Sequence, residues 1–119
     1  MGEQPGVIID TDILIKIYRG NKEHKHVLQD LFPNLIISCI TQMKLLIGRN
    51  NKKTQDEVEE NLKSYKILGI NTPIISIAHE IIKKYSFSYK ISIADNFIKA
   101  TALFYSLELY TDKKHFDLS

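Results

Sequence analysis

Val7-Ile8-Ile9-Asp10 is a short apolar run that ends in a carboxylate, and the chain repeats this arrangement near its end. There the segment 109–111 precedes Asp112, and Asp95 follows another mostly apolar segment. In an open parallel sheet, the residues just past the carboxyl ends of the strands gather at one edge, where ligands usually bind. We therefore expect Asp10, Asp95 and Asp112 to lie close together at that edge.

The apolar residues between these acids follow the spacing of alternating strands and helices. Four short runs are typical of buried strands: Val7 to Asp10, Leu35 to Ser38, Ile67 to Ile70 and Leu109 to Thr111. Between them apolar residues recur at helical spacing. The most apolar of these segments contains Ile98, Ala102 and Tyr105, and we expect it to pack centrally. Alternation of strands and helices favours a parallel sheet covered by helices, so the predicted fold class is α/β.

The composition is that of one soluble domain, which we expect to span residues 1–119. Of the 119 residues, 44% are hydrophobic and 25% are charged, which is ordinary for a globular protein. The net charge of +2 allows a nucleic-acid partner but does not require one. The single cysteine, Cys39, excludes a disulfide framework. With no signal-peptide pattern at residues 1–5 and no membrane-spanning apolar run, we expect a cytoplasmic protein with no membrane partner.

Each acid also has a structural interpretation. A carboxylate directly after Val-Ile-Ile would be buried, and an unpaired buried charge is costly, so Asp10 needs a metal, a cation or backbone donors. Asp12 is better explained as the cap of the following helix. Ser92 and Asp95 match the serine-x-x-acid box that caps a helix, which is compatible with a ligand role for Asp95. For Asp112, a simple turn residue and a site residue remain equally open.

Carboxylates gathered at one edge suit a hard divalent cation, which takes oxygen ligands, and therefore metal-assisted chemistry on a phosphate ester. Four segments together resemble the PIN domain, and specifically the VapC-type toxins of bacterial toxin–antitoxin systems. In order along the chain, they are residues 7–15, 38–48, 94–102 and 110–116. The resemblance implies a three-layer α/β/α sandwich around a short parallel sheet.

The resemblance also implies a function. Such toxins are endoribonucleases that cut RNA with Mg²⁺ or Mn²⁺ held by a ring of acids, and Asp10, Asp95 and Asp112 would be the metal-site carboxylates. Thr11 and Thr111 stand where the family often has a small hydroxyl residue beside the site. The implied partners are an RNA substrate, a cognate antitoxin protein that blocks the acid pocket, and a second copy of the chain in a homodimer.

Lys44 stands at a position where the family has an acid. With Thr41 as the expected N-cap, Lys44 would also fall in the first helical turn, where a cation opposes the helix dipole by roughly 0.3–1 kcal/mol. Its side chain could extend to solvent and leave the acids a weak metal site. Its ammonium could instead take the metal position beside Asp10 and Asp95, or a lysine could have been placed there to disarm a toxic protein. Because the site must gather positive charge, we expect impaired activity.

Other functions fit less of the sequence. Asp10-Thr11-Asp12 copies the start of haloacid-dehalogenase-like phosphatases, but Ile13-Leu14 does not supply the hydroxyl that follows there. A receiver domain needs an acid after its third strand, and none follows residues 67–72 directly. His24 and His26 would lie on different helix faces, so we expect both to be exposed. The non-enzymatic alternative is a PIN-like module with an inactive metal site that binds an antitoxin or forms oligomers.

Overall fold

The computed structural model describes residues 6–88 and 90–112, and its elements alternate between strand and helix as predicted. Their bounds, in chain order, are β1 (Val7–Ile9), α1 (Thr11–Tyr18), α2 (Lys22–Leu31), β2 (Ile36–Ser38), α3 (Cys39–Ile47), α4 (Lys52–Asn61), the 3₁₀ helix η1 (Leu62–Ser64), β3 (Lys66–Leu68), α5 (Thr72–Tyr85), α6 (Ile93–Phe104) and β4 (Glu108–Tyr110). In the described part of the chain, no helix has the length and apolar character needed to cross a membrane.

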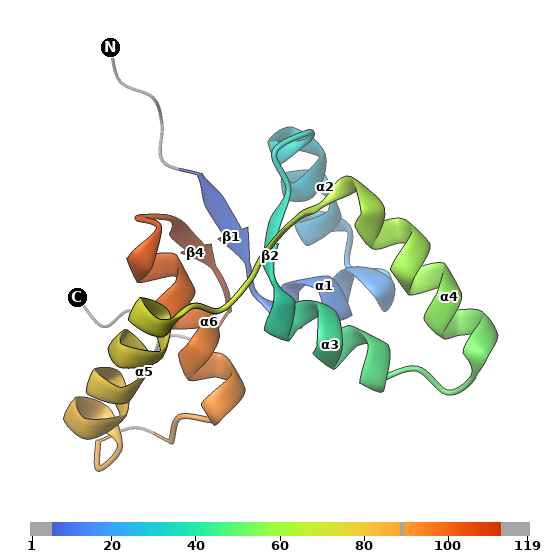
Figure 1. The fold of residues 1–119 in the computed structure, drawn as a ribbon. Helices are drawn as coiled ribbons and strands as arrows, with labels where there is room; N and C mark the ends of the chain where they lie inside the picture. The colour runs from blue at the N-terminus through green and yellow to red at the C-terminus, as the bar shows by residue number, and fades with distance from the viewer. Residues whose placement is uncertain (1–5, 89, 113–119) are drawn as a thin grey trace.

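The four strands form one parallel sheet in the order β3-β2-β1-β4. β1 lies inside the sheet, where Ile8 is in register with Ile36 of β2 on one side and with Leu109 of β4 on the other. Segments from the two ends of the described chain therefore lie side by side at the sheet (Figure 1). This arrangement places the carboxyl ends of β1 and β4 next to each other.

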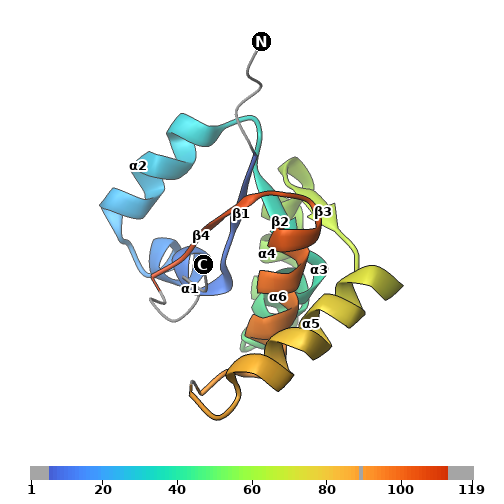
Figure 2. The ribbon, with the colours of Figure 1, turned by 90° about the vertical axis from the view of Figure 1, so that its left-hand side faces the viewer.

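Helices cover both faces of the sheet, which confirms the predicted three-layer α/β/α sandwich. In Figure 1, α5 and α6 lie to the left of the strands and α1 to α4 lie to the right, and Figure 2 shows α5 and α6 packed together. Because successive strand residues face opposite sides, Ile8 and Ile9 each point into a different helical layer. Both are fully buried, which explains why β1 is a continuous apolar run.

Helix α6 is the central helix that the sequence predicts. Ile98 is fully buried in it. An Ile98→Val substitution is expected to lower the free energy of unfolding by about 0.5–1.5 kcal/mol, because it removes one buried methyl group. Urea denaturation measures the loss. The matched control is Ile47→Val, at a side chain that is 82% exposed, and it is expected to change little; equal losses in the two variants would contradict the central packing of α6.

Helix α3 begins earlier than predicted. Its N-cap is Ser38, whose Oγ accepts a hydrogen bond from the backbone N–H of Ile40 at 3.1 Å, and Thr41 is fully buried inside the helix. Thr41 is therefore not the cap. Lys44 consequently lies in the last turn of α3, where a cation interacts favourably with the helix dipole. The predicted local conflict between Lys44 and the dipole is wrong.

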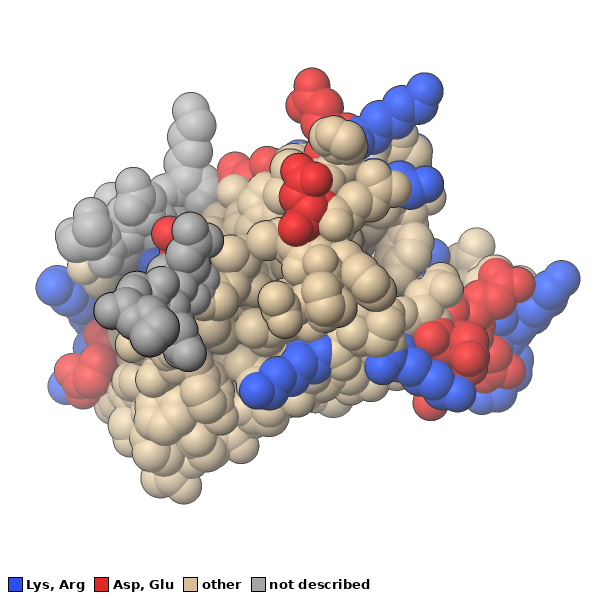
Figure 3. Space-filling model, turned by 90° about the horizontal axis from the view of Figure 1, so that it is seen from above, with Lys and Arg blue, Asp and Glu red and all other residues tan. Residues whose placement is uncertain are grey.

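Helix α4 begins at Lys52. Its surface charges pair with one another, as in the contact of Lys52 Nζ with Asp56 Oδ1 at 3.0 Å. Figure 3 shows blue and red side chains intermixed at the right-hand end of the molecule, where α4 lies, rather than a patch of one sign. This distribution agrees with the modest net charge of +2.

Candidate functional site

Asp10 lies at the carboxyl end of β1 and is fully buried. Its side chain caps α1 by accepting a hydrogen bond from the Thr11 N–H at 2.7 Å. The hydroxyl of Thr111 donates to the other carboxylate oxygen at 2.6 Å, and the Asp10 N–H donates to the carbonyl of Tyr110 at 2.9 Å. Asp10 is thus the cap of α1, and the prediction that Asp12 caps this helix is wrong.

Asp10 and Asp12 are neighbouring acids, and their proximity disfavours the charged form of Asp10. Burial, and after it the neighbouring Asp12, together raise the pKa of Asp10 to about 7, against the lowering effect of the hydrogen bonds from Thr111 and Thr11. Oδ1 of Asp12 is buried and has no hydrogen-bond partner among the described residues. A buried oxygen without a donor is costly, so this part of the pocket favours a proton or a cation.

Asp95 enters the same region from the first turn of α6 and is 7% exposed. Its N–H donates to the hydroxyl of Ser92 at 3.0 Å, which confirms Ser92 as the cap of α6. Nζ of Lys44, on α3, lies 3.7 Å from Oδ1 of Asp95. The Lys44 side chain therefore does not simply extend to solvent, since its ammonium contributes a positive charge next to one of the predicted site acids.

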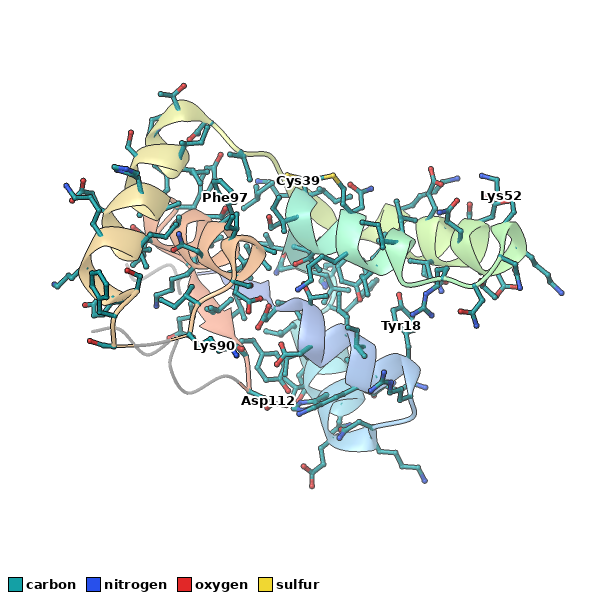
Figure 4. All side chains as sticks on the ribbon, turned by 90° about the horizontal axis from the view of Figure 1, so that it is seen from below. Tyr18, Cys39, Lys52, Lys90, Phe97 and Asp112 are labelled. Carbon is teal, nitrogen blue, oxygen red and sulfur yellow. The ribbon has the colours of Figure 1, made fainter. Side chains whose placement is uncertain are left out.

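Asp112 is oriented differently. Its Oδ2 contacts Nζ of Lys16 and lies 3.2 Å from Nε2 of His24. In Figure 4, which looks from below at the carboxyl ends of the strands, Asp112 lies beside the blue ribbons of α1 and α2. The hydrogen bond from Lys16 holds the pKa of the Asp112 carboxyl below its usual range. Thr111, its neighbour in the chain, is the residue of this segment that reaches Asp10.

The residues as they stand do not fit a divalent metal ion. Within residues 6–88 and 90–112, no three His, Cys, Asp or Glu side chains lie together in a group that could hold one. Lys44 pairs with Asp95, and Asp112 pairs with Lys16 and His24. Lys16 also interacts electrostatically with Asp12. Among the described residues, the three predicted carboxylates therefore do not form one group, and Lys44 lies beside one of them.

Several residues at this edge of the sheet make contacts that the sequence does not predict. Thr41 accepts a hydrogen bond from the hydroxyl of Thr11 at 3.0 Å, so two buried hydroxyl groups line the pocket beside Asp10. His24, expected to be exposed, is only 15% exposed and contacts the hydroxyl of Tyr110 as well as Asp112. These contacts join residues that are 86 and 88 positions apart, so no local sequence pattern predicts that α2 lies beside the end of β4. Residues 113–116 of the fourth matching segment lie outside the described residues.

Solved structures of other proteins share the fold of this chain. A toxin–antitoxin complex from Klebsiella pneumoniae is similar at 29% identity, covering 95% of this chain and 92% of that chain with a TM-score of 0.82. FitAcB from Neisseria gonorrhoeae is similar at 25% identity, covering 92% of this chain and 89% of that chain with a TM-score of 0.76. VapBC2 from Rickettsia felis, bound to a DNA fragment from its promoter, covers the same shares at 18% identity and a TM-score of 0.78, and shows the shared fold alone.

A search of curated proteins found no match. The family model described as the PIN domain matches residues 7–118, nearly the whole sequence. The sheet order, the acids at the carboxyl ends of β1 and beside α6, and this match lead to one conclusion. The chain belongs to the PIN domain family.

Proposed function

We propose that this chain is the toxin of a toxin–antitoxin pair, with the fold and acid pocket of a metal-dependent endoribonuclease and with cleavage impaired by Lys44. Two of the similar structures at 25% identity or more, including the Klebsiella complex described as toxin and antitoxin, support a role of this kind. The observation that carries the proposal is the contact between the Lys44 ammonium and the buried Asp95 at 3.7 Å, in a chain where another predicted site acid, Asp10, is also buried.

The charge balance of the pocket explains why Lys44 would impair cleavage. Mg²⁺ and Mn²⁺ bind through several oxygen ligands, and carboxylates supply the negative charge that holds them. Lys44 gives Asp95 a positive neighbour without supplying a ligand, so it lowers the attraction of the pocket for a dication. A glutamate at position 44 would instead place a third carboxylate with Asp10 and Asp95. The site of the variant would then contain the carboxylate ligands that the family resemblance implies.

The direct test is cleavage of single-stranded RNA by the chain and by its Lys44→Glu variant, in Mg²⁺, in Mn²⁺ and in EDTA. If the variant cleaves RNA, EDTA abolishes this cleavage, and the unmodified chain cleaves little or not at all, the result supports both the nuclease function and the inhibitory effect of Lys44. Equal cleavage by the two proteins would support the nuclease function but contradict the effect of Lys44. If neither protein cleaved RNA although both were folded, the nuclease function would be contradicted.

A second candidate function is a catalytically inactive PIN domain that binds an antitoxin or forms a homodimer. The same contact between Lys44 and Asp95 favours it, because an internal cation stabilises the acid without any metal. In that case the Lys44→Glu variant would gain neither metal binding nor cleavage. Light scattering of the purified chain measures the proposed homodimer. The proposed RNA substrate and the proposed cytoplasmic location apply to the first candidate function.

A further inference from the structure

Four side chains from three elements meet outside the acid pocket: Lys16 of α1, His24 of α2, Tyr110 of β4 and Asp112, which we call the Asp112 cluster. Asp112 Oδ2 contacts Lys16 Nζ and lies 3.2 Å from His24 Nε2. The other ring nitrogen of His24 contacts the Tyr110 hydroxyl, and the two rings meet edge to face with centroids 5.5 Å apart. The cluster therefore joins the first two helices to the end of β4.

The hydrogen-bonding groups of the cluster match. In a neutral imidazole one ring nitrogen donates and the other accepts. With Nε2–H donating to Asp112, Nδ1 of His24 is left to accept the hydroxyl of Tyr110. The contact between His24 and Tyr110 is part-buried, whereas the contacts of Asp112 with Lys16 and with His24 are both exposed, and Lys16 itself is 46% exposed. Because an exposed contact of this kind contributes little by itself, Asp112 is held by its contacts with Lys16 and His24 together.

The segment from Tyr110 to Asp112 makes contacts in two directions. The carbonyl of Tyr110 accepts the Asp10 N–H at 2.9 Å, and the hydroxyl of Thr111 donates to Asp10 Oδ2 at 2.6 Å. Successive side chains of an extended segment point to opposite sides. With Thr111 directed at the pocket, Asp112 is directed at the helices α1 and α2.

We infer that Asp112 is a positioning residue: its attachment to His24 and Lys16 fixes the Thr111 hydroxyl on Asp10, and its own carboxylate stays outside the acid pocket. The inference deepens the proposed function, because it assigns to Asp112 a role other than that of the third metal ligand. A substitution of His24 should then weaken the hydrogen bond between Thr111 and Asp10 in the same way as a substitution of Asp112. A ligand role for Asp112 predicts no such agreement.

The test uses the metal-free chain, so its outcome does not depend on nuclease activity. Asp112→Ala and His24→Ala are each expected to speed hydrogen exchange of the Asp10 N–H several-fold and to shift the ¹³Cγ resonance of Asp10 in the same direction. Asp112→Asn, which retains an acceptor for His24, and His24→Gln, which retains a donor for Asp112, should show smaller changes. Asp56→Asn breaks the exposed ion pair with Lys52 and is the control that leaves Asp10 unchanged.

Two outcomes would overturn the inference. In the first, Asp112→Ala leaves the exchange and the resonance of Asp10 at their original values in a folded chain. In the second, Mn²⁺ titration of the Lys44→Glu chain shows a loss of affinity of tenfold or more on adding Asp112→Asn, and none on adding His24→Ala. That pattern would make Asp112 a ligand. If the Lys44→Glu chain binds no Mn²⁺, the proposed metal site fails, and the exchange of the Asp10 N–H still decides the role of Asp112.

Discussion

A Lys44→Glu variant is expected to cleave RNA about 100-fold faster than the unmodified chain when Mg²⁺ or Mn²⁺ is present, on the scale of other single electrostatic contributions at active sites. The substitution removes the cation that lies 3.7 Å from Asp95 and adds a carboxylate at the same place. Both changes increase the attraction of the pocket for a dication. The measurement is the initial rate of cleavage of a fluorescent RNA at several metal concentrations.

Two further variants separate the effects of charge and ligand. Lys44→Met removes the ammonium but supplies no oxygen, so its rate is expected to lie much closer to that of the unmodified chain. Adding Asp10→Asn to Lys44→Glu is expected to abolish the gain, because Asp10 is the fully buried acid of the pocket. If Lys44→Met cleaved as fast as Lys44→Glu, removal of the lysine alone would explain the gain and the role of a carboxylate at position 44 would be refuted.

In the otherwise unmodified chain, Asp10→Asn is expected to raise the free energy of unfolding at pH 8 by a few kcal/mol. Burial raises the pKa of Asp10 from its usual 3.8 to about 7, and each pKa unit corresponds to about 1.4 kcal/mol. Asparagine is an equally good helix cap and carries no charge. Its amide also resembles the protonated acid, with an N–H group that suits the unpartnered oxygen of Asp12.

The expected pH dependence follows from the direction of this shift. Because the folded state holds the Asp10 proton more tightly than the unfolded state, stability falls as pH rises from about 4 to about 7 and then levels off. In Asp10→Asn this contribution is missing, so the two proteins should differ little at pH 4 and most at pH 8. Urea denaturation across this range measures the difference, with Asp56→Asn as an exposed control. An equal dependence on pH in both proteins would contradict the raised pKa.

The sequence predicts the fold better than it predicts the site. The apolar runs of β1 and β4 and the packing of α6 are local patterns, and the structure confirms each of them. Three of the strands are nevertheless shorter than predicted, as in β3, which ends at Leu68 before Gly69, and β4 begins one residue earlier than predicted. Ser92 caps α6 as predicted, but the predicted N-caps of two other helices are wrong because several capping residues lie close together there. Ser38 rather than Thr41 caps α3, and Asp10 rather than Asp12 caps α1.

The orientation of the site residues depends on contacts that no local pattern encodes. Whether Thr111 or Asp112 faces Asp10 is set by a shift of one residue along the chain, which moves a side chain to the opposite side. The partners of Asp112 are Lys16 and His24, and neither has a motif that connects it to β4. Lys44 stands out in the sequence because the family resemblance gives a reason to expect an acid at its position, and because Thr41 as an N-cap would place it in the first helical turn. Its contact with Asp95 required the packing of α3 on α6.

The pairing of β1 with β4 also sets a time at which the pocket can first exist. Residues 7–9 emerge from the ribosome well before residues 108–110, so β1 can pair with β2 at a time when its partners in β4 have not yet been made. At typical synthesis rates of about 5–20 residues per second, that interval is roughly 5 to 20 seconds. During it Asp10 has neither the carbonyl of Tyr110 nor the hydroxyl of Thr111. Every newly made molecule thus passes through a period without a finished pocket, in which a binding partner made alongside it can arrive first.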